Sequence, residues 1–163
     1  KGLMQLLDAM ALLPEYFHLI VAGESYEDFS EYEKKINEQQ IGHRVHLHIH
    51  YIPDHEVSTF FSASDCCVLP YISATQSGII AIARHFETPI ISTNVGGLAE
   101  FIQDQEEGYL VSPNNPNELA MAIEACLKNG QIEKMQTAIR ERNHTFSWDF
   151  FADQVLKFAK QSS

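Results

Sequence analysis

The sequence predicts an α/β fold in which a parallel sheet is covered by helices on both faces. Short apolar runs rich in β-branched residues alternate along the chain with stretches of helical periodicity, and the connections between them are short. Strands joined through helices run parallel, because each helix returns the chain to the same end of the sheet by a right-handed crossover. With 163 residues, of which 45% are hydrophobic, the chain suits one compact domain over residues 1–163.

The strands are expected where a short apolar run ends at a glycine, a proline or polar residues. The run from Phe17 to Ala22 is β-rich and stops at Gly23. Between Arg44 and Ile52 apolar and polar residues alternate, which is typical of a half-exposed strand. The expected strands cover residues 17–23, 44–52, 66–69, 89–93 and 108–111.

The helices are expected where apolar residues recur at helical spacing or where a capping pattern opens a segment. Asn115 can cap a helix, Pro116 suits its first position, and Glu118 completes a capping box. Gly130 is a suitable end for that helix, and a last helix is expected from Ser147. The apolar face of this last helix consists of Trp148, Phe151, Val155 and Phe158. The expected helices cover residues 2–13, 26–40, 53–64, 77–86, 96–102, 115–130, 131–143 and 147 onward.

The first expected element is a helix with no strand before it, and the chain begins with Lys1 rather than Met. In an alternating α/β fold each such helix normally follows a strand. We therefore expect that the first strand of the sheet is missing here and that the sequence starts inside a longer protein.

The composition disfavours several classes of partner. A formal net charge of −11 argues against nucleic acid and anionic membrane surfaces, and no stretch approaches the roughly 20 apolar residues of a membrane span. The three cysteines do not form a disulfide framework. The adjacent Cys66 and Cys67 are expected to point to opposite faces of their strand as small core residues. We expect a cytoplasmic protein without a metal or cofactor.

The best candidate for a ligand site lies at the carboxyl ends of the expected strands, where open parallel sheets bind their ligands. Two loops there carry glycine at the start of a helix, at Ser77-Gly78 and at Gly96-Gly97. Glycine allows close approach of a backbone, and the N–H groups of a first helical turn attract phosphate. Ordinary tight turns are the alternative from this pattern alone. The chain has neither the G-x-G-x-x-G nor the G-x-x-x-x-G-K-[ST] motif.

Six motifs follow one another in an order that is similar to that of one large family. They are KGLMQLLDAMALL, LIVAGE, RVHLHIHYIPDHEVSTFFSASDCCVLPY, SGIIAIARHFETPIISTNVGGLAEFI, EGYLVSPNNPNELAMAI and FSW. Over nearly its whole length the chain resembles the C-terminal, donor-binding half of retaining glycosyltransferases of the GT-B fold, glycosyltransferase family 4 (glycosyl transferases group 1). The resemblance implies a Rossmann-like domain that binds a nucleoside-diphosphate sugar, facing a missing N-terminal Rossmann-like domain of the same chain.

The resemblance also implies which residues hold the donor diphosphate. In the family an Arg and a Lys-Gly pair contact it; Lys1-Gly2 matches the pair, and the Arg would lie upstream. A lysine is a mobile point charge, suited to neutralising phosphate oxygens as they depart. The backbone N–H groups of Ser77, Gly78 and Ile79 would complete this site. For Lys1, a solvated terminal lysine is the alternative from the residues alone.

One family element departs from its usual pattern in this chain. In E-x-x-G-x-x-x-x-E the first glutamate contacts the donor sugar and the last usually contacts the ribose. Registering on Gly78 places Thr75 and Ala83 at these positions, so neither carboxylate is present. Thr75 and Gln76 are the candidates for the sugar contact, since both carry hydrogen-bonding groups. Arg84, next to the second position, is read as a surface residue.

Two further family positions are matched more loosely. Tyr51 and Ile52 stand where the family seats the base, with ordinary packing as the alternative. Glu100 also matches a family position, but a carboxylate at a helix N-terminus is favoured by the helix dipole as well.

Three histidines alternate along one expected strand and could suggest a metal. His46, His48 and His50 would lie on one face of this strand, and three histidines can bind zinc or copper. No further ligand stands at a fixed spacing, so a half-exposed strand at the edge of the sheet is the preferred reading. The alternating apolar residues expected to face the core are Val45, Leu47 and Ile49.

The resemblance therefore implies the donor-binding half of a hexosyltransferase. The reaction implied by the resemblance moves a sugar from a nucleoside diphosphate to an acceptor hydroxyl with retention, with no catalytic residue from this half, so the fragment alone would be inactive. A catalytically lapsed domain with a scaffolding or regulatory role is the alternative, because both glutamates are missing.

A flavodoxin-like signalling domain shares the alternation of strands and helices but would need an acidic cluster at the end of the first strand. The protein is expected in the cytoplasm, or at the inner membrane surface through the missing domain.

Overall fold

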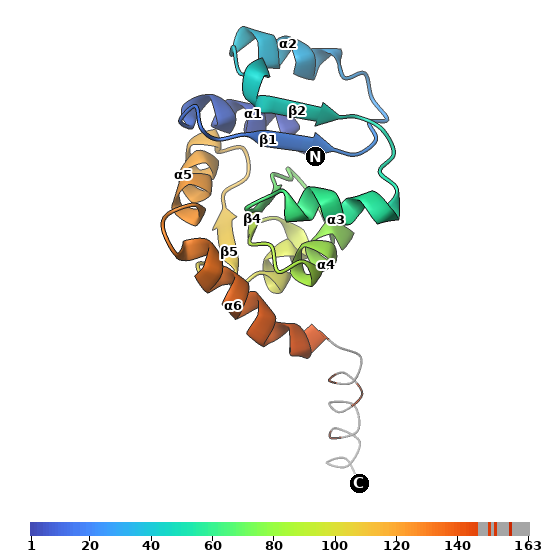
Figure 1. The fold of residues 1–163 in the computed structure, drawn as a ribbon, viewed down its shortest axis with the longest axis vertical. Coiled ribbons are helices and arrows are strands. Elements are labelled where there is room, and N and C mark those ends of the chain that lie inside the picture. The colour runs from blue at the N-terminus through green and yellow to red at the C-terminus, as the bar shows by residue number, and fades with distance from the viewer. Residues whose placement is uncertain (147–149, 151, 153–156, 158–163) are drawn as a thin grey trace.

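A computed structural model describes residues 1–146 together with residues 150, 152 and 157, and it shows an α/β fold (Figure 1). The strands are β1 (Leu19–Ala22), β2 (Val45–His48), β3 (Cys67–Leu69), β4 (Ile90–Thr93) and β5 (Gly108–Val111). The helices are α1 (Leu3–Leu12), α2 (Ser30–Glu38), α3 (Asp54–Ser62), α4 (Gly78–His85), α5 (Pro116–Cys126) and α6 (Gln131–Asn143). Short 3-10 helices are η1 (Gly42–Arg44), η2 (Gly96–Phe101) and η3 (His144–Phe146).

The predicted order of strands and helices is confirmed along this part of the chain. The helix expected from Ser147 lies outside the described residues, and so does the apolar face assigned to it, Trp148, Phe151, Val155 and Phe158.

The strands are all parallel, but they form two sheets where the sequence suggested one. β1 pairs with β2, with Leu19 opposite Val45. β4 lies between β3 and β5, with Ile90 opposite both Cys67 and Gly108. Within the described residues β1 and β3 each have a single neighbouring strand, so each leaves one edge unpaired. In Figure 1, β2 lies on the far side of β1 from β4 and β5.

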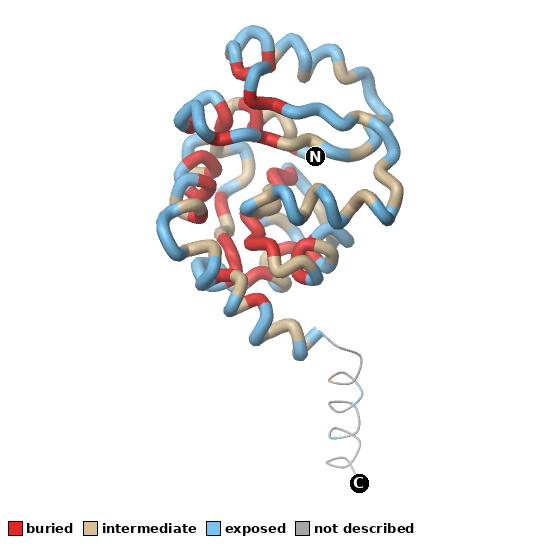
Figure 2. Tube along the Cα trace, viewed as in Figure 1, coloured by how far each residue is buried: buried red, intermediate tan, exposed pale blue. Residues whose placement is uncertain are grey.

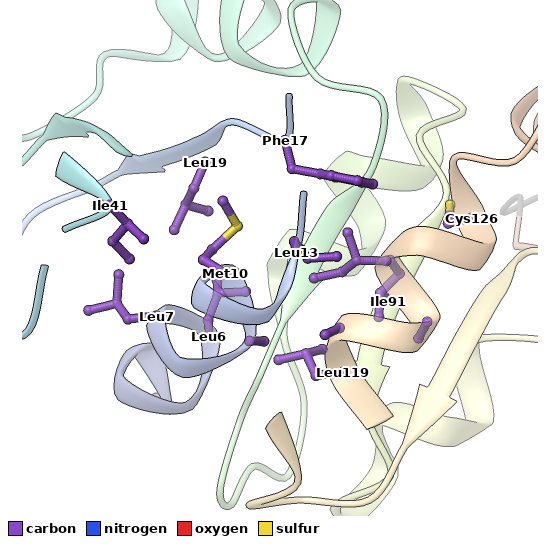
Figure 3. Close-up of a cluster of buried hydrophobic side chains, with 14 of the residues drawn as sticks. Leu6, Leu7, Met10, Leu13, Phe17, Leu19, Ile41, Ile91, Leu119 and Cys126 are labelled. Atoms are coloured by element: carbon purple, nitrogen blue, oxygen red, sulfur yellow. The ribbon is translucent and has the colours of Figure 1, made fainter. Parts of the chain in front are cut away.

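Helices cover both faces of the β3–β5 sheet, as predicted. Successive residues of a strand point to opposite faces, and β4 shows this directly. Ile91 belongs to a core cluster with residues of α1 and α5 (Figure 3), whereas Ile90 packs in a second cluster with residues of α4 and η2. β4 is buried along its whole length, and Figure 2 shows further buried residues on parts of α1 and α5.

Helix α1 matters for the site because its N-terminus carries Lys1, and the guanidinium of Arg44 fixes its other end. Arg44 is 2% exposed, and its Nη2 donates to the carbonyl of Met10 at 2.7 Å while its Nη1 donates to those of Leu13 and Pro14 at 3.0 and 2.8 Å. The last carbonyls of a helix have no partner within the helix, and a positive charge there complements the helix dipole. Arg44 therefore anchors α1 from its C-terminal end.

The expected capping box is present at α5, in a modified form. The Asn115 side chain accepts a hydrogen bond from the Glu118 N–H at 3.2 Å, and the Glu118 carboxylate accepts from the Asn115 side chain and from the Ser112 N–H. The predicted end at Gly130 is wrong by several residues. The helix ends at Cys126, and Gly130 instead adopts a φ of 75° directly before α6.

The expected face assignment of β2 is partly wrong. Val45 is buried as predicted and His46, His48 and His50 are exposed, but Leu47 is 37% exposed. A sheet of two strands has too little cover to bury the inner face of its outer strand, so the alternation in the sequence does not translate into burial here.

The adjacent cysteines do lie on opposite faces, as predicted. Cys66 packs against the cluster with α1 and α5, and Cys67 packs against the cluster with α4 and η2. A hydrogen bond with Cys126, together with burial, raises the pKa of the Cys66 thiol. Burial raises the pKa of Cys67 to about 12. Neither thiol is poised to react.

Candidate functional site

The N-terminus of α4 is the anion-binding element of the site. β3 ends at Leu69, and after a short loop Ser77, in an extended conformation, precedes the first helical residue, Gly78. No side chain among the described residues caps this helix, although serine is a preferred cap. The first N–H groups of α4 therefore point out of the helix with their partial positive charge available.

Lys1 is brought to the same place by the start of α1. Gly2 adopts a φ of 82° as the N-cap residue of that helix. It lies so close to the chain after β3 that an added Cβ would be 1.7 Å from the Pro70 carbonyl oxygen. The Gln5 side chain also donates to that carbonyl. This close packing, which only glycine permits, places the start of α1 against the end of β3.

A pocket of about 510 Å³ lies between Lys1 and the start of α4. It is lined by Lys1, Tyr71, Ile82 and the segment 73–79. Among these described lining residues Lys1 carries the only charge, and no described carboxylate forms an ion pair with its ammonium group. The rest of the lining offers hydroxyls, one amide side chain and backbone groups. This combination suits a compact anion with polar substituents.

Tyr71 connects the two sides of the pocket. The Lys1 Nζ lies 5.8 Å from the centroid of its ring, within the range of a cation–π contact. Its hydroxyl is hydrogen bonded to the Ser77 hydroxyl at 3.2 Å. Tyr71 was not singled out from the sequence; its place directly after a proline at the end of a strand was the signal that could have drawn attention to it.

β4 and the turn that follows it hold the loop that carries the site in place, through hydrogen bonds and close packing. The buried Thr93 hydroxyl donates to the Tyr71 carbonyl at 2.6 Å. The Gly97 N–H donates to the Thr75 carbonyl at 3.3 Å. Gly96, with a φ of 53°, lies against the backbone of Ala74. The Gly96-Gly97 pair was considered a second anion-binding helix start, but here it supports the first.

The structure brings most of the predicted donor residues together. Lys1 lies opposite the contiguous segment that contains Thr75, Gln76, Ser77, Gly78 and Ile79, and all of them line the pocket. Their roles toward a ligand stay a prediction.

The residues suggested for the base, and the matched glutamate, lie apart from this pocket. Tyr51 is 67% exposed and Ile52 is half-buried, and neither is among the lining residues. Glu100 is exposed on η2 and is also absent from the lining.

The second vacated glutamate position has no access to the pocket. Ala83 is completely buried in the core beneath α4. Arg84 was read as a surface residue, and this is wrong, since it is 5% exposed. Its guanidinium pairs with the Glu107 carboxylate at 2.9 Å, and Arg142 pairs with the other oxygen at 2.7 Å.

Glu107 is the buried centre of this ion-pair network. Its side chain is 1% exposed. Burial acts to raise the pKa of this carboxyl, but hydrogen bonds from Arg84 and the Gln103 N–H, with the charges of Arg84 and Arg142, outweigh burial and lower it. The network ties α4 to the start of β5 and to α6, which holds the helix behind the site in place.

The residues that the structure describes contain no group of three or more His, Cys, Asp or Glu side chains placed to hold a metal ion. No helix among them combines the length and the apolar character that a membrane span needs.

The known proteins to which this chain is similar include glycosyltransferases. A family model described as "Glycosyl transferases group 1" matches residues 1–129. An uncharacterized glycosyltransferase of Methanocaldococcus jannaschii is 25% identical over 166 residues, which cover 98% of this chain and 42% of that protein. A D-inositol 3-phosphate glycosyltransferase of Paenarthrobacter aurescens is 33% identical over 108 residues, covering 66% of this chain and 26% of that protein.

Solved structures with the same fold are glycosyltransferases of the GT-B class. A sucrose-phosphate synthase from Thermosynechococcus elongatus has a TM-score of 0.80 and 27% identity, covering 99% of this chain and 42% of that chain. Anabaena HepE, solved in complex with UDP, has a TM-score of 0.84 at 20% identity, and the match covers 99% of this chain and 45% of that chain. This likeness shows the fold alone. The chain spans less than half the length of each of these proteins.

Proposed function

Because the chain belongs to the glycosyl transferases group 1 family, we propose that its pocket holds the diphosphate of a nucleotide-sugar donor. The observation that carries the proposal is that, within the described residues, a lysine without an ion-pair partner and a helix start without a side-chain cap share one pocket. A diphosphate needs positive charge and several N–H donors at once. Lys1 supplies the charge, and the backbone N–H groups of Ser77, Gly78 and Ile79 supply the donors.

The donor sugar would lie beside the same loop. Thr75 and Gln76 are exposed and line the pocket, and their hydroxyl and amide groups can each donate to and accept from sugar hydroxyls. Ala83 is buried, so a ribose contact would have to come from another residue. The binding of the sugar would therefore rest on neutral groups, in contrast to the carboxylates of the family pattern.

We propose Tyr51 for the contact with the base of the donor. The ring of Tyr51 is largely exposed and could stack on a base, since aromatic faces bind flat apolar surfaces. Tyr51 and Ile52 do not line the pocket. The base would therefore have to extend from the pocket toward the end of β2.

The reaction we propose is transfer of a hexosyl group from a nucleoside diphosphate to an acceptor hydroxyl, with retention. As the bond to the sugar breaks, negative charge builds on the departing diphosphate. Groups fixed in advance where this charge develops lower the barrier to transfer. Lys1 and the start of α4 would act in this way. The acceptor and any proton-transfer group would be supplied by the rest of the protein, so this chain alone would bind a donor without transferring its sugar.

The two sheets support the proposal that the domain contains further chain. β1 and β3 each leave an unpaired edge, while one core cluster contains residues of both sheets. We propose that one more parallel strand lies between them in the complete protein, as part of a two-domain enzyme. The cytoplasm, or the inner membrane surface through the other domain, is the proposed location.

A catalytically lapsed domain is the second candidate. It is favoured by the absence of any carboxylate among the described lining residues of the pocket. The two candidates differ in one measurement on the complete protein, the hydrolysis or transfer of sugar from a nucleotide sugar. An enzyme turns the donor over, whereas a lapsed domain binds it unchanged.

Calorimetry tests the shared part of the proposal. The protein would be titrated with UDP, GDP and ADP and with the matching nucleotide glucoses; UDP-glucose comes first because HepE has been solved with it. We expect binding of at least one nucleoside diphosphate at millimolar concentration or below. The absence of heat from every nucleotide in this range would contradict the proposal.

A further inference from the structure

Tyr71 contacts both halves of the pocket. It is 8% exposed and belongs to the core cluster beneath α4. Its ring lies under the Lys1 ammonium, and its hydroxyl is bonded to the Ser77 hydroxyl. Its carbonyl is fixed by Thr93. No other lining residue contacts both Lys1 and the start of α4 in the hydrogen bonds and ring contacts of the described residues.

The Ser77 hydroxyl is bonded to Tyr71, and α4 is left without a side-chain cap. A serine in the position before a helix normally accepts a hydrogen bond from an N–H of the first turn. Here this would be the Ile79 N–H, because the Ile80 N–H already donates to the Ser77 carbonyl at 3.2 Å. The Ser77 backbone is extended, as a capping residue requires, yet its side chain makes no capping bond. The hydroxyl is bonded to Tyr71 instead.

We propose that Tyr71 is a positioning residue that holds the Ser77 hydroxyl away from α4 and so keeps the first N–H groups of the helix available to an anion. If Ser77 were released, its hydroxyl would turn inward, cap α4 and compete with the phosphate oxygens for the Ile79 N–H. The ring of Tyr71 acts on the other side of the pocket, where its negative face holds the Lys1 ammonium close to the helix start. This inference rests on the proposed function, because the anion it serves is the donor diphosphate.

Tyr71→Phe separates these two effects, because it keeps the buried ring and removes the hydroxyl. A serine cap is worth roughly 1 kcal/mol, so we expect the Kd for UDP to rise about fivefold. The melting temperature should not fall, because the released Ser77 hydroxyl caps α4 and stabilises the helix. Tyr71→Leu removes the ring as well, and its Kd should rise further. Tyr109→Phe is the matched control, since it removes a tyrosine hydroxyl that contacts Gln131 and does not line the pocket; its Kd should equal that of the wild type.

A second substitution distinguishes positioning from ordinary packing. In the Tyr71→Phe background, Ser77→Ala removes the side chain that would cap α4, so the affinity for UDP should recover relative to Tyr71→Phe alone. A residue with a purely structural role would show no such recovery. All four variants would be measured by calorimetry in the complete protein that carries this chain, with the best-binding nucleoside diphosphate as the probe if this is not UDP.

The outcomes separate the inference from the proposed function. If the wild type binds no nucleoside diphosphate, both fail. If the wild type binds, but Tyr71→Phe binds equally well or the double variant does not recover, the role of Tyr71 is wrong and the proposed donor site stands. A weaker Tyr71→Phe rescued by Ser77→Ala supports both.

Discussion

At Gly96 one added methyl group should displace the loop of the donor site while leaving the residues that line the pocket unchanged. Its φ of 53° is left-handed, and a Cβ built on it would lie 1.8 Å from the Ala74 carbonyl oxygen and 3.5 Å from the Thr75 Cα. Gly96→Ala therefore carries two separate costs. One is the strain of a left-handed alanine, and the other is a collision with the loop that begins the donor site.

The size of the effect follows from these distances. The left-handed conformation costs an alanine about 1–2 kcal/mol. Ordinary contact begins at 3.4 Å and the built Cβ lies at 1.8 Å, so the Ala74 backbone and the loop after it must move by about 1.6 Å. A displacement of about 1 Å can cost 100-fold in rate. We expect sugar transfer by the complete protein to fall about 100-fold in kcat/KM and nucleotide binding to weaken. The measurements are a transfer assay with the nucleotide sugar and calorimetry with UDP.

Two other glycines serve as controls. Gly78→Ala has no atom within 4 Å and no left-handed φ, so the fold should be unchanged or up to about 1 kcal/mol more stable, and binding alone should suffer because the new methyl group lies in the pocket. In Gly42→Ala the added Cβ would contact only Ile36, at an ordinary 3.6 Å, so neither the stability of the fold nor ligand binding should change. If Gly96→Ala matches Gly42→Ala in kcat/KM and in Kd, the idea that this turn positions the donor loop is refuted.

Three further perturbations test other parts of the account. Lys1→Ala should weaken UDP binding about 10- to 100-fold, the usual worth of a hydrogen bond to a charged group, while the exposed Lys34→Ala should not; equal affinities would remove Lys1 from the site. Glu107→Gln should lower the free energy of unfolding by about 3 kcal/mol because it leaves buried arginine unpaired, compared with less than about 1 kcal/mol for Glu87→Gln in a surface pair. Since the pKa of Glu107 is lowered in the folded state, this stabilisation is fully present above its ordinary pKa of 4.5 and is lost as the pH falls through the folded-state value; an acid unfolding profile identical in wild type and Glu107→Gln would contradict it. With its pKa raised to about 12, Cys67 should resist alkylation at pH 8 in the folded protein and react only on unfolding, as mass spectrometry can show.

The order of the elements could be predicted because it is a local property. The spacing of apolar residues, the glycine after β1 and the cap at Asn115 each act within a few residues of the chain. The division into two sheets could not be predicted in this way. It depends on whether β1 and β3 have a common neighbour, and no pattern inside either strand reports that. The exposure of Leu47 has the same origin, since a strand in a two-stranded sheet lacks the cover that its alternation suggests.

Several of the residues that line the site could be predicted from the sequence, but the residues that hold them in place could not. Lys1 and residues 75–79 were identified because motif order links them to a family, and the structure places them around one pocket. Arg84 was misread because its partner Glu107 lies 23 residues away, and no local pattern joins the two. Tyr71 escaped notice for the same reason. Its role depends on Lys1, 70 positions earlier in the chain, which lies over its ring because Gly2 packs against Pro70.

The most direct test of the donor site is backbone amide NMR of the isotope-labelled chain during a titration with UDP. At 18.5 kDa the chain is small enough for amide signals to be assigned residue by residue. We predict the largest shifts at the amides of Ser77, Gly78 and Ile79, with smaller ones at Gly2 and Tyr71, all saturating with one affinity. Saturable shifts centred elsewhere, or none at these amides at millimolar UDP, would contradict the claim that the start of α4 holds the diphosphate.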